Sequence, residues 1–157
     1  MRSRNVRRVG GRLIPLSWLV LVLATVAAVN LALIYLLFTV DHPGGDLSGF
    51  LPIMAIGTLP FLVPAGLFAW VIAMARASAE GSQVPRQVSG RVRAISGFGL
   101  PFMIVGGLWA GLAAAFLGLE QGSPAGYALM LYQFTFLAAV LADGLTLVVA
   151  LRTRVAS

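Results

Sequence analysis

The chain has 157 residues, of which 59% are apolar, and its mean hydropathy is +0.95. All eleven basic residues are arginines, and they give a formal net charge of +6 at pH 7. This composition excludes an ordinary soluble domain, in which nearly half of the residues are apolar. The absence of cysteine excludes disulfides, thiolate catalysis and iron–sulfur clusters built by this chain.

Four apolar segments are each long enough to cross a hydrocarbon core of about 30 Å, which takes about 20 helical residues. They comprise residues 13–40, 51–75, 94–119 and 125–151. We therefore expect an all-α integral membrane protein, with four transmembrane helices running up, down, up and down in one membrane domain, residues 1–157. The first apolar run exceeds the roughly 7–15 residues of a cleaved signal peptide, which predicts an uncleaved helix.

The arginines lie on one side of the four predicted spans. They are Arg2, Arg4, Arg7, Arg8 and Arg12 before the first span, Arg76, Arg86, Arg91 and Arg93 between the second and third, and Arg152 and Arg154 after the fourth. Short connections rich in arginine stay in the cytoplasm. We expect a multi-pass protein of the plasma membrane with both termini and a loop at 78–93 in the cytoplasm. The lack of lysine beside abundant arginine and alanine favours a GC-rich bacterial genome.

The loops carry little chemistry. Asp41, His42 and Asp46 lie in one turn rich in glycine and proline, but three potential ligands in such a turn are weak evidence for a metal. We expect no metal site and no cofactor. The loop at 78–93 is polar and lacks the apolar face of an interfacial helix, so it is interpreted as a topology determinant over anionic headgroups or as a partner-binding segment. We expect no nucleic-acid binding, because no aromatic-rich basic surface accompanies the charge.

Small residues recur every fourth position in the second and third spans, and such ridges let helices approach closely in lipid. We expect helix packing, within the chain or between subunits, at Ala65, Ala69, Ala73, Gly107, Gly111 and Ala115. The ridges single out the third helix as the centre of packing.

Prolines mark one helix start and several bends. Ser123 followed by Pro124 predicts the start of the fourth helix, because serine caps a helix and proline suits its first position. Pro60, Pro64 and Pro101 lie inside spans, where each removes a backbone donor and favours a kink. The kinks either improve packing or open a cavity lined by unpaired carbonyls.

Asp143 is the acidic residue inside a span, eight residues before Leu151 and so about 12 Å from the end of the helix. A central aspartate costs roughly 2.5–3.5 kcal/mol to insert, so it should face protein or water. Helical periodicity places Tyr132 and Thr146 on the same stripe, with Thr135 at its margin.

Three interpretations of Asp143 compete. An arginine could reach inward to form an ion pair, and the candidates are Arg12, Arg76 and Arg93. The carboxyl could instead gain and lose a proton that couples transport to a gradient, or it could pair with a partner subunit. Asn30, in the first span, lies too far from Asp143 to meet it and is expected to form an interhelical hydrogen bond.

No catalytic set meets at one depth, so we do not expect an enzyme. The sequence favours a non-catalytic accessory or scaffold subunit that assembles with another membrane protein or with copies of itself. The alternative is an oligomeric, proton-coupled transporter of small solutes that uses Asp143.

Overall fold

The chain is described by a computed structural model over residues 2–41, 50–77, 84–116 and 122–155, with side chains over 12–40, 55–76, 88–113 and 122–152. Its elements are α1 (Arg2–Asp41), α2 (Phe50–Ala77), α3 (Val84–Phe116) and α4 (Pro124–Val155). Each helix is long and apolar enough to cross a membrane. The predicted all-α fold with four such helices is confirmed.

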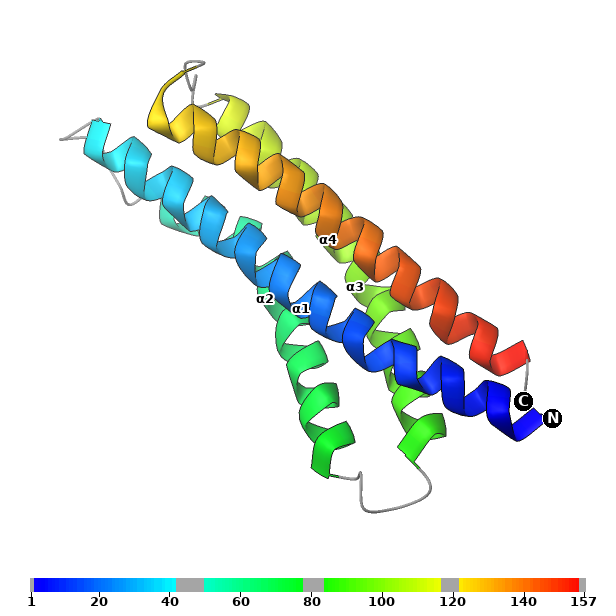
Figure 1. Cartoon of the computed structure of the whole chain (residues 1–157). Helices are drawn as coiled ribbons and strands as arrows, with labels where there is room; N and C mark the ends of the chain where they lie inside the picture. The colour runs from blue at the N-terminus through cyan, green and yellow to red at the C-terminus, as the bar shows by residue number, and fades with distance from the viewer. Residues whose placement is uncertain (1, 42–49, 78–83, 117–121, 156–157) are drawn as a thin grey trace.

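The four helices pack as a bundle in which each lies beside two others (Figure 1). The most extensive contact joins α1 to α4, and α1 rather than the predicted α3 makes the most contact in total. The start of α1, the end of α2, the start of α3 and the end of α4 share one end of the bundle. We call it the arginine-bearing end, because every described arginine side chain lies there. They are Arg12, Arg76, Arg91, Arg93 and Arg152.

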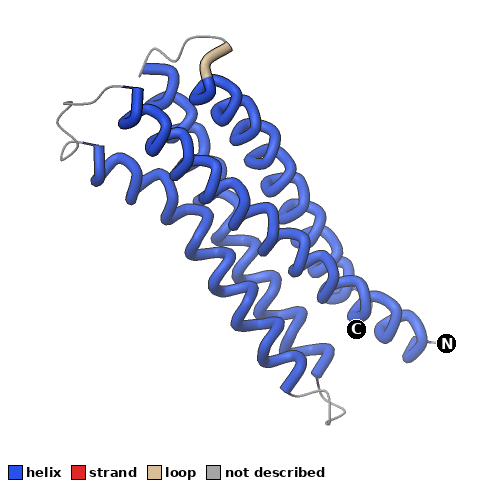
Figure 2. The backbone as a smooth tube through the Cα atoms, turned by 60° about the vertical axis from the view of Figure 1, so that its left-hand side comes forward, coloured by secondary structure: helices blue, strands red, loops and turns tan. Residues whose placement is uncertain are grey.

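The α2–α3 pair diverges from the α1–α4 pair towards this end (Figures 1 and 2). The prolines at which kinks were predicted lie inside these two helices, Pro60 and Pro64 in α2 and Pro101 in α3. Both helices continue through their prolines. The two helix pairs therefore separate from each other without a break in α2 or α3.

Helix α3 begins at Val84, so residues 84–93 are helical where a loop was predicted. The reason is an apolar stripe that the polar residues around it concealed. Val88, Val92 and Ile95 follow helical spacing, and Val92 is fully buried. The rest of the predicted loop, residues 78–83, lies outside the described residues, as do His42 and Asp46.

Ser123 caps α4 as predicted. The backbone N–H of Gly126 donates to Ser123 Oγ at 3.0 Å, and the N–H of Tyr127 donates to the Ser123 carbonyl at 3.0 Å. Helix α4 then begins at Pro124, where the missing N–H leaves no intrahelical bond unmade.

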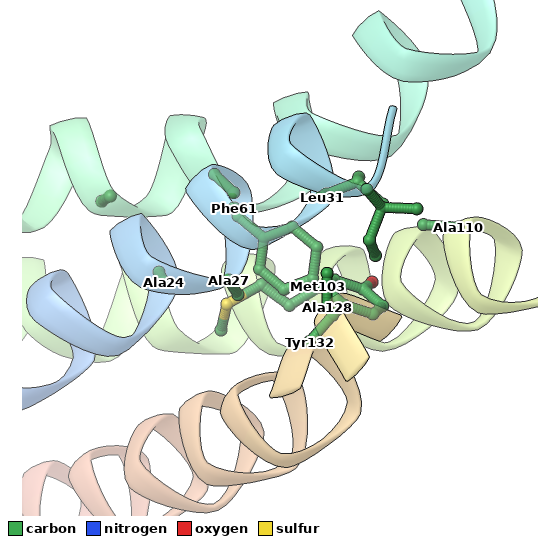
Figure 3. Packing of buried hydrophobic residues seen from close by; sticks show 11 residues of the cluster. Ala24, Ala27, Leu31, Phe61, Met103, Ala110, Ala128 and Tyr132 are labelled. Atoms are coloured by element: carbon green, nitrogen blue, oxygen red, sulfur yellow. The ribbon is translucent and has the colours of Figure 1, made fainter. Parts of the chain in front are cut away.

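Buried apolar side chains form two clusters. The distal cluster, away from the arginine-bearing end, is built from all four helices around Phe61, Met103 and Tyr132 (Figure 3). Phe61 meets Tyr132 and Phe136 edge to face, with centroids 6.0 and 6.1 Å apart. The proximal cluster, nearer that end, also draws on all four helices and includes Leu13, Phe68, Val92 and Ala150.

Glycines of α3 receive the proline rings of α2. A Cβ on Gly106 would fall within the Pro60 ring, and one on Gly99 would lie 3.3 Å from Cβ and Cγ of Pro64. Gly107 is equally close to a different neighbour, the ring of Phe136 on α4. The close approach of α3 to both neighbours therefore depends on glycine.

The predicted packing residues divide into two groups. Ala65 and Gly107 are buried at helix contacts, whereas Ala69 is half-buried and Ala73 is exposed. Gly111 is half-buried and has no atom of another residue near the position of a Cβ. The side chain of Ala115 lies outside the described residues. Ala73 therefore faces outward from the described bundle, because residues spaced by four rotate by about 40° per step around a helix.

Candidate functional site

Asp143 lies inside the bundle, between the two apolar clusters. Its side chain is 0% exposed, and the flanking Leu141 and Leu145 face outward. Ala142, beside it, belongs to the proximal cluster, whereas Tyr132, three turns along α4, belongs to the distal cluster. The predicted orientation of the stripe is confirmed, since Tyr132 and Thr146 are buried with Asp143.

The carboxylate points toward α3, near the place where α3 meets Pro64 of α2. A Cβ on Gly99 would lie 3.6 Å from Asp143 Oδ2 and 3.3 Å from the Pro64 ring, so Gly99 leaves the space in which the carboxylate and the ring meet α3. Ser96, one turn before Gly99, is 0% exposed and presents its hydroxyl to the carboxylate. We call Asp143, Ser96, Gly99 and Pro64 the carboxyl site.

The carboxyl site holds polar atoms without hydrogen bonds. Ser96 Oγ and both carboxylate oxygens are buried, and none has a partner that meets hydrogen-bond geometry among the described residues. The Ser96 hydroxyl thus faces Asp143 at a separation or angle that falls short of a full bond. Buried polar groups are bonded in the large majority of cases, so this pair is exceptional.

None of the three candidate arginines forms an ion pair with Asp143, which corrects that interpretation within the described side chains. The guanidinium of Arg76 instead lies over the Trp18 ring, 5.2 Å from its centroid. Arg12 is exposed. Arg93 is displaced from Ser96 by three residues, about 60° around α3 and about 4.5 Å towards the arginine-bearing end.

The burial of Asp143 also weakens the interpretation that it pairs with a partner subunit. A carboxylate that contacts another subunit has to reach the outer surface of its own bundle. Asp143 is enclosed by its own helices. Of the three interpretations, proton uptake and release is the one that neither the burial of Asp143 nor its lack of an ion pair contradicts.

The other candidate residues are not part of the carboxyl site. Asn30 Nδ2 donates to Thr135 Oγ1 at 3.3 Å, which confirms the predicted interhelical bond and joins α1 to α4. Tyr132 donates its hydroxyl to the Gly107 carbonyl at 3.1 Å, about 16 Å along α4 from Asp143. Thr146 is nearer, but its hydroxyl donates to the Ala142 carbonyl at 2.7 Å within α4.

Ser96 is buried, whereas Gly97 and Pro101 on the same helix are exposed. Gly99 and Pro64 were not predicted as neighbours of Asp143. The signal for Gly99 was its position one turn after Ser96, on the buried face of α3, but nothing in the sequence shows which helix that face meets.

The carboxyl group of Asp143 can hold a proton. No group of three or more histidine, aspartate or glutamate residues that could hold a metal occurs within the described part of the chain. The chain matches no protein-family model, no curated protein and no solved structure.

Proposed function

We propose that the chain is a multi-pass protein of the bacterial plasma membrane that works without catalysis, as an accessory or scaffold subunit. It would assemble with another membrane protein or with copies of itself. We place the arginine-bearing end of the bundle on the cytoplasmic side of the membrane. The support is that all four helices contribute a guanidinium to one end, as the positive-inside rule requires.

The observation that carries the assembly proposal is an uncovered face of α2. Gly66 and Ala73 are exposed, Ala69 is half-buried, and a Cβ on Gly66 would meet no atom within 4 Å. Small residues on an outward face allow a second helix to approach closely where lipid gives no hydrophobic drive for association. The buried polar side chains of Asn30 and Tyr132 form their hydrogen bonds inside the bundle, so these two bonds do not join the chain to another subunit.

The cysteine-free sequence makes the test simple, because each introduced cysteine is the sole thiol. We expect Gly66→Cys or Ala73→Cys to form an oxidative disulfide with the same cysteine of a second copy in native membranes. A photoactivatable crosslinker attached to the thiol should capture a different partner, which mass spectrometry would identify. Leu141→Cys, on the exposed face of α4, is the matched control. Equal crosslinking at all three positions would contradict an interface on α2.

The orientation has its own test. A cysteine replacing Ser82, in the predicted cytoplasmic connection, should react with a membrane-impermeant maleimide in inverted vesicles but not in intact cells. A cysteine replacing Ser48 should show the opposite pattern. Labelling of Ser82→Cys in intact cells would refute the proposed orientation.

The second candidate is a proton-coupled transporter, and the carboxyl site favours it. An uncompensated carboxylate inside a membrane bundle is costly and is usually tied to a proton or substrate path. Such a protein would take up a proton on Asp143 as it moves a small solute. Four helices are few for a carrier, so this candidate would act as an oligomer.

Proteoliposomes with an enclosed pH-sensitive dye test this candidate directly. After an imposed pH step, wild-type protein should dissipate the proton gradient faster than empty vesicles, and Asp143→Asn should not. Thr146→Val is a matched control, because it changes a buried polar residue on the same helix that already bonds within α4. Equal proton flux in the wild type and Asp143→Asn would eliminate the mechanism.

A further inference from the structure

Two arginines at the arginine-bearing end rest on tryptophan rings. The guanidinium of Arg76, on α2, lies over Trp18 of α1 with 5.2 Å to the ring centroid. That of Arg91, on α3, lies over Trp70 of α2 at 5.1 Å. One stack bridges α1 and α2 and the other bridges α2 and α3, so they lie on the two flanks of α2.

Neither stacked arginine has a carboxylate partner among the described side chains. The one described carboxylate is that of Asp143, which is buried and forms no ion pair. Arg91 Nη1 donates to Met74 Sδ at 2.8 Å, and Met74 is a neutral thioether. Both guanidinium charges are therefore uncompensated within the described part of the chain.

A tryptophan ring under the guanidinium leaves its N–H edges available, apart from the Nη1–H of Arg91 that is bonded to Met74. The ring attracts the flat face of the cation, whereas phosphate oxygens bind in the plane of the guanidinium, along its N–H edges. Trp18 and Trp70 are both exposed. Tryptophan is also the residue enriched at headgroup depth in membrane proteins, where phosphate is the abundant anion.

We propose that Arg76 with Trp18, and Arg91 with Trp70, form two binding sites for the phosphate of an anionic phospholipid on the flanks of α2. Five described arginines at this end favour an anionic headgroup over a zwitterionic one, whose ammonium they would repel. The inference depends on the membrane location proposed above and is independent of any assembly or transport.

The tryptophans themselves provide the assay. Three variants, each with two tryptophans replaced by phenylalanine, retain Trp18, Trp70 or Trp109 alone. Trp109 is an exposed residue of α3 about 27 Å along the helix from Arg91 and is the reference. Each variant is reconstituted with phosphatidylglycerol or phosphatidylcholine carrying brominated chains, and the quenching of fluorescence gives the relative affinity for the two lipids.

We expect Trp18 and Trp70 to prefer phosphatidylglycerol about fivefold, the factor that corresponds to about 1 kcal/mol for one arginine near the surface. Trp109 should show no preference. Arg76→Gln should abolish the preference at Trp18, whereas Arg152→Gln, which removes the same charge from the exposed end of α4, should leave it intact. Quenching of the Trp18 fluorescence by brominated phosphatidylcholine shows whether the Arg76→Gln variant still inserts into the bilayer. Arg76→Lys should lower the preference for phosphatidylglycerol by less than Arg76→Gln does.

Four results would overturn the inference. Equal preference at Trp18 and Trp109, or equal loss in Arg76→Gln and Arg152→Gln, would indicate a general attraction to charge. Displacement of phosphatidylglycerol by excess inorganic phosphate would assign the sites to the free anion. Absence of quenching by either lipid at all three tryptophans would refute the membrane location as well.

Discussion

Replacing Gly106 by alanine tests the contact between α2 and α3. The added Cβ would fall within the ring of Pro60. That ring is part of the α2 backbone and has no rotamer by which it could move away, so the two helices have to separate locally. Gly111→Ala, in the same helix, is the matched control because its Cβ would meet no atom within 4 Å.

The expected difference between these variants can be worked out because helix propensity cancels. Alanine is favoured over glycine in a helix by about 1 kcal/mol, and both substitutions gain this term. Overpacking a well-filled contact costs about 1–3 kcal/mol, and only Gly106→Ala suffers it. We therefore expect Gly106→Ala to be about 1–3 kcal/mol less stable than Gly111→Ala. Gly107→Ala should fall between them, because Phe136 is half-buried and can turn aside.

Reversible unfolding by dodecyl sulfate in mixed micelles, followed by circular dichroism, measures these free energies. The ordering Gly111→Ala, Gly107→Ala, Gly106→Ala from most to least stable is the expected result. Equal stability of Gly106→Ala and Gly111→Ala, within about 0.5 kcal/mol, would refute the close contact of Pro60 with α3.

Three further predictions use the same unfolding assay. A double-mutant cycle with Asn30→Ala and Thr135→Ala should give a coupling of about 0.6 kcal/mol and no more than about 1.7, because one interhelical hydrogen bond joins them. Zero coupling would show that the bond does not form. Tyr132→Phe should lower the free energy of unfolding by about 1 kcal/mol, because the Gly107 carbonyl loses this donor while the ring contacts remain. Unchanged stability would contradict a role for this hydrogen bond. Asp143→Asn should unfold at no lower dodecyl sulfate concentration than the wild type, because neither carboxylate oxygen has a hydrogen bond to lose. A clear loss of stability would reveal a partner for the carboxylate.

The helices could be predicted because their signals are local. Length of an apolar run is enough to indicate a helix that can cross a membrane, and Ser123 with Pro124 indicates where α4 begins. Asn30 could be assigned a hydrogen bond because a buried amide needs one, although its partner Thr135 could not be named.

Predictions that depend on a neighbouring helix were less reliable. The ridge containing Ala65 and Ala73 passes from the core to the surface, and the sequence does not show where a neighbour ceases to cover it. Similarly, the sequence indicates that the charged side chain of Arg76 contacts another group near the end of its span. The choice between Asp143 and the face of Trp18 depends on which helix lies alongside, which is a tertiary property.

The position of Asp143 between two apolar clusters has a consequence for access. A proton or water molecule coming from the arginine-bearing end meets the proximal cluster, where Phe68 and Val92 are fully buried, before it reaches the carboxylate. From the opposite end it meets Phe61 and Met103 of the distal cluster, which are buried to the same degree. The bundle thus has a closed barrier on each side of its one described carboxylate, and the rate at which Asp143 exchanges protons is set by how often those side chains part.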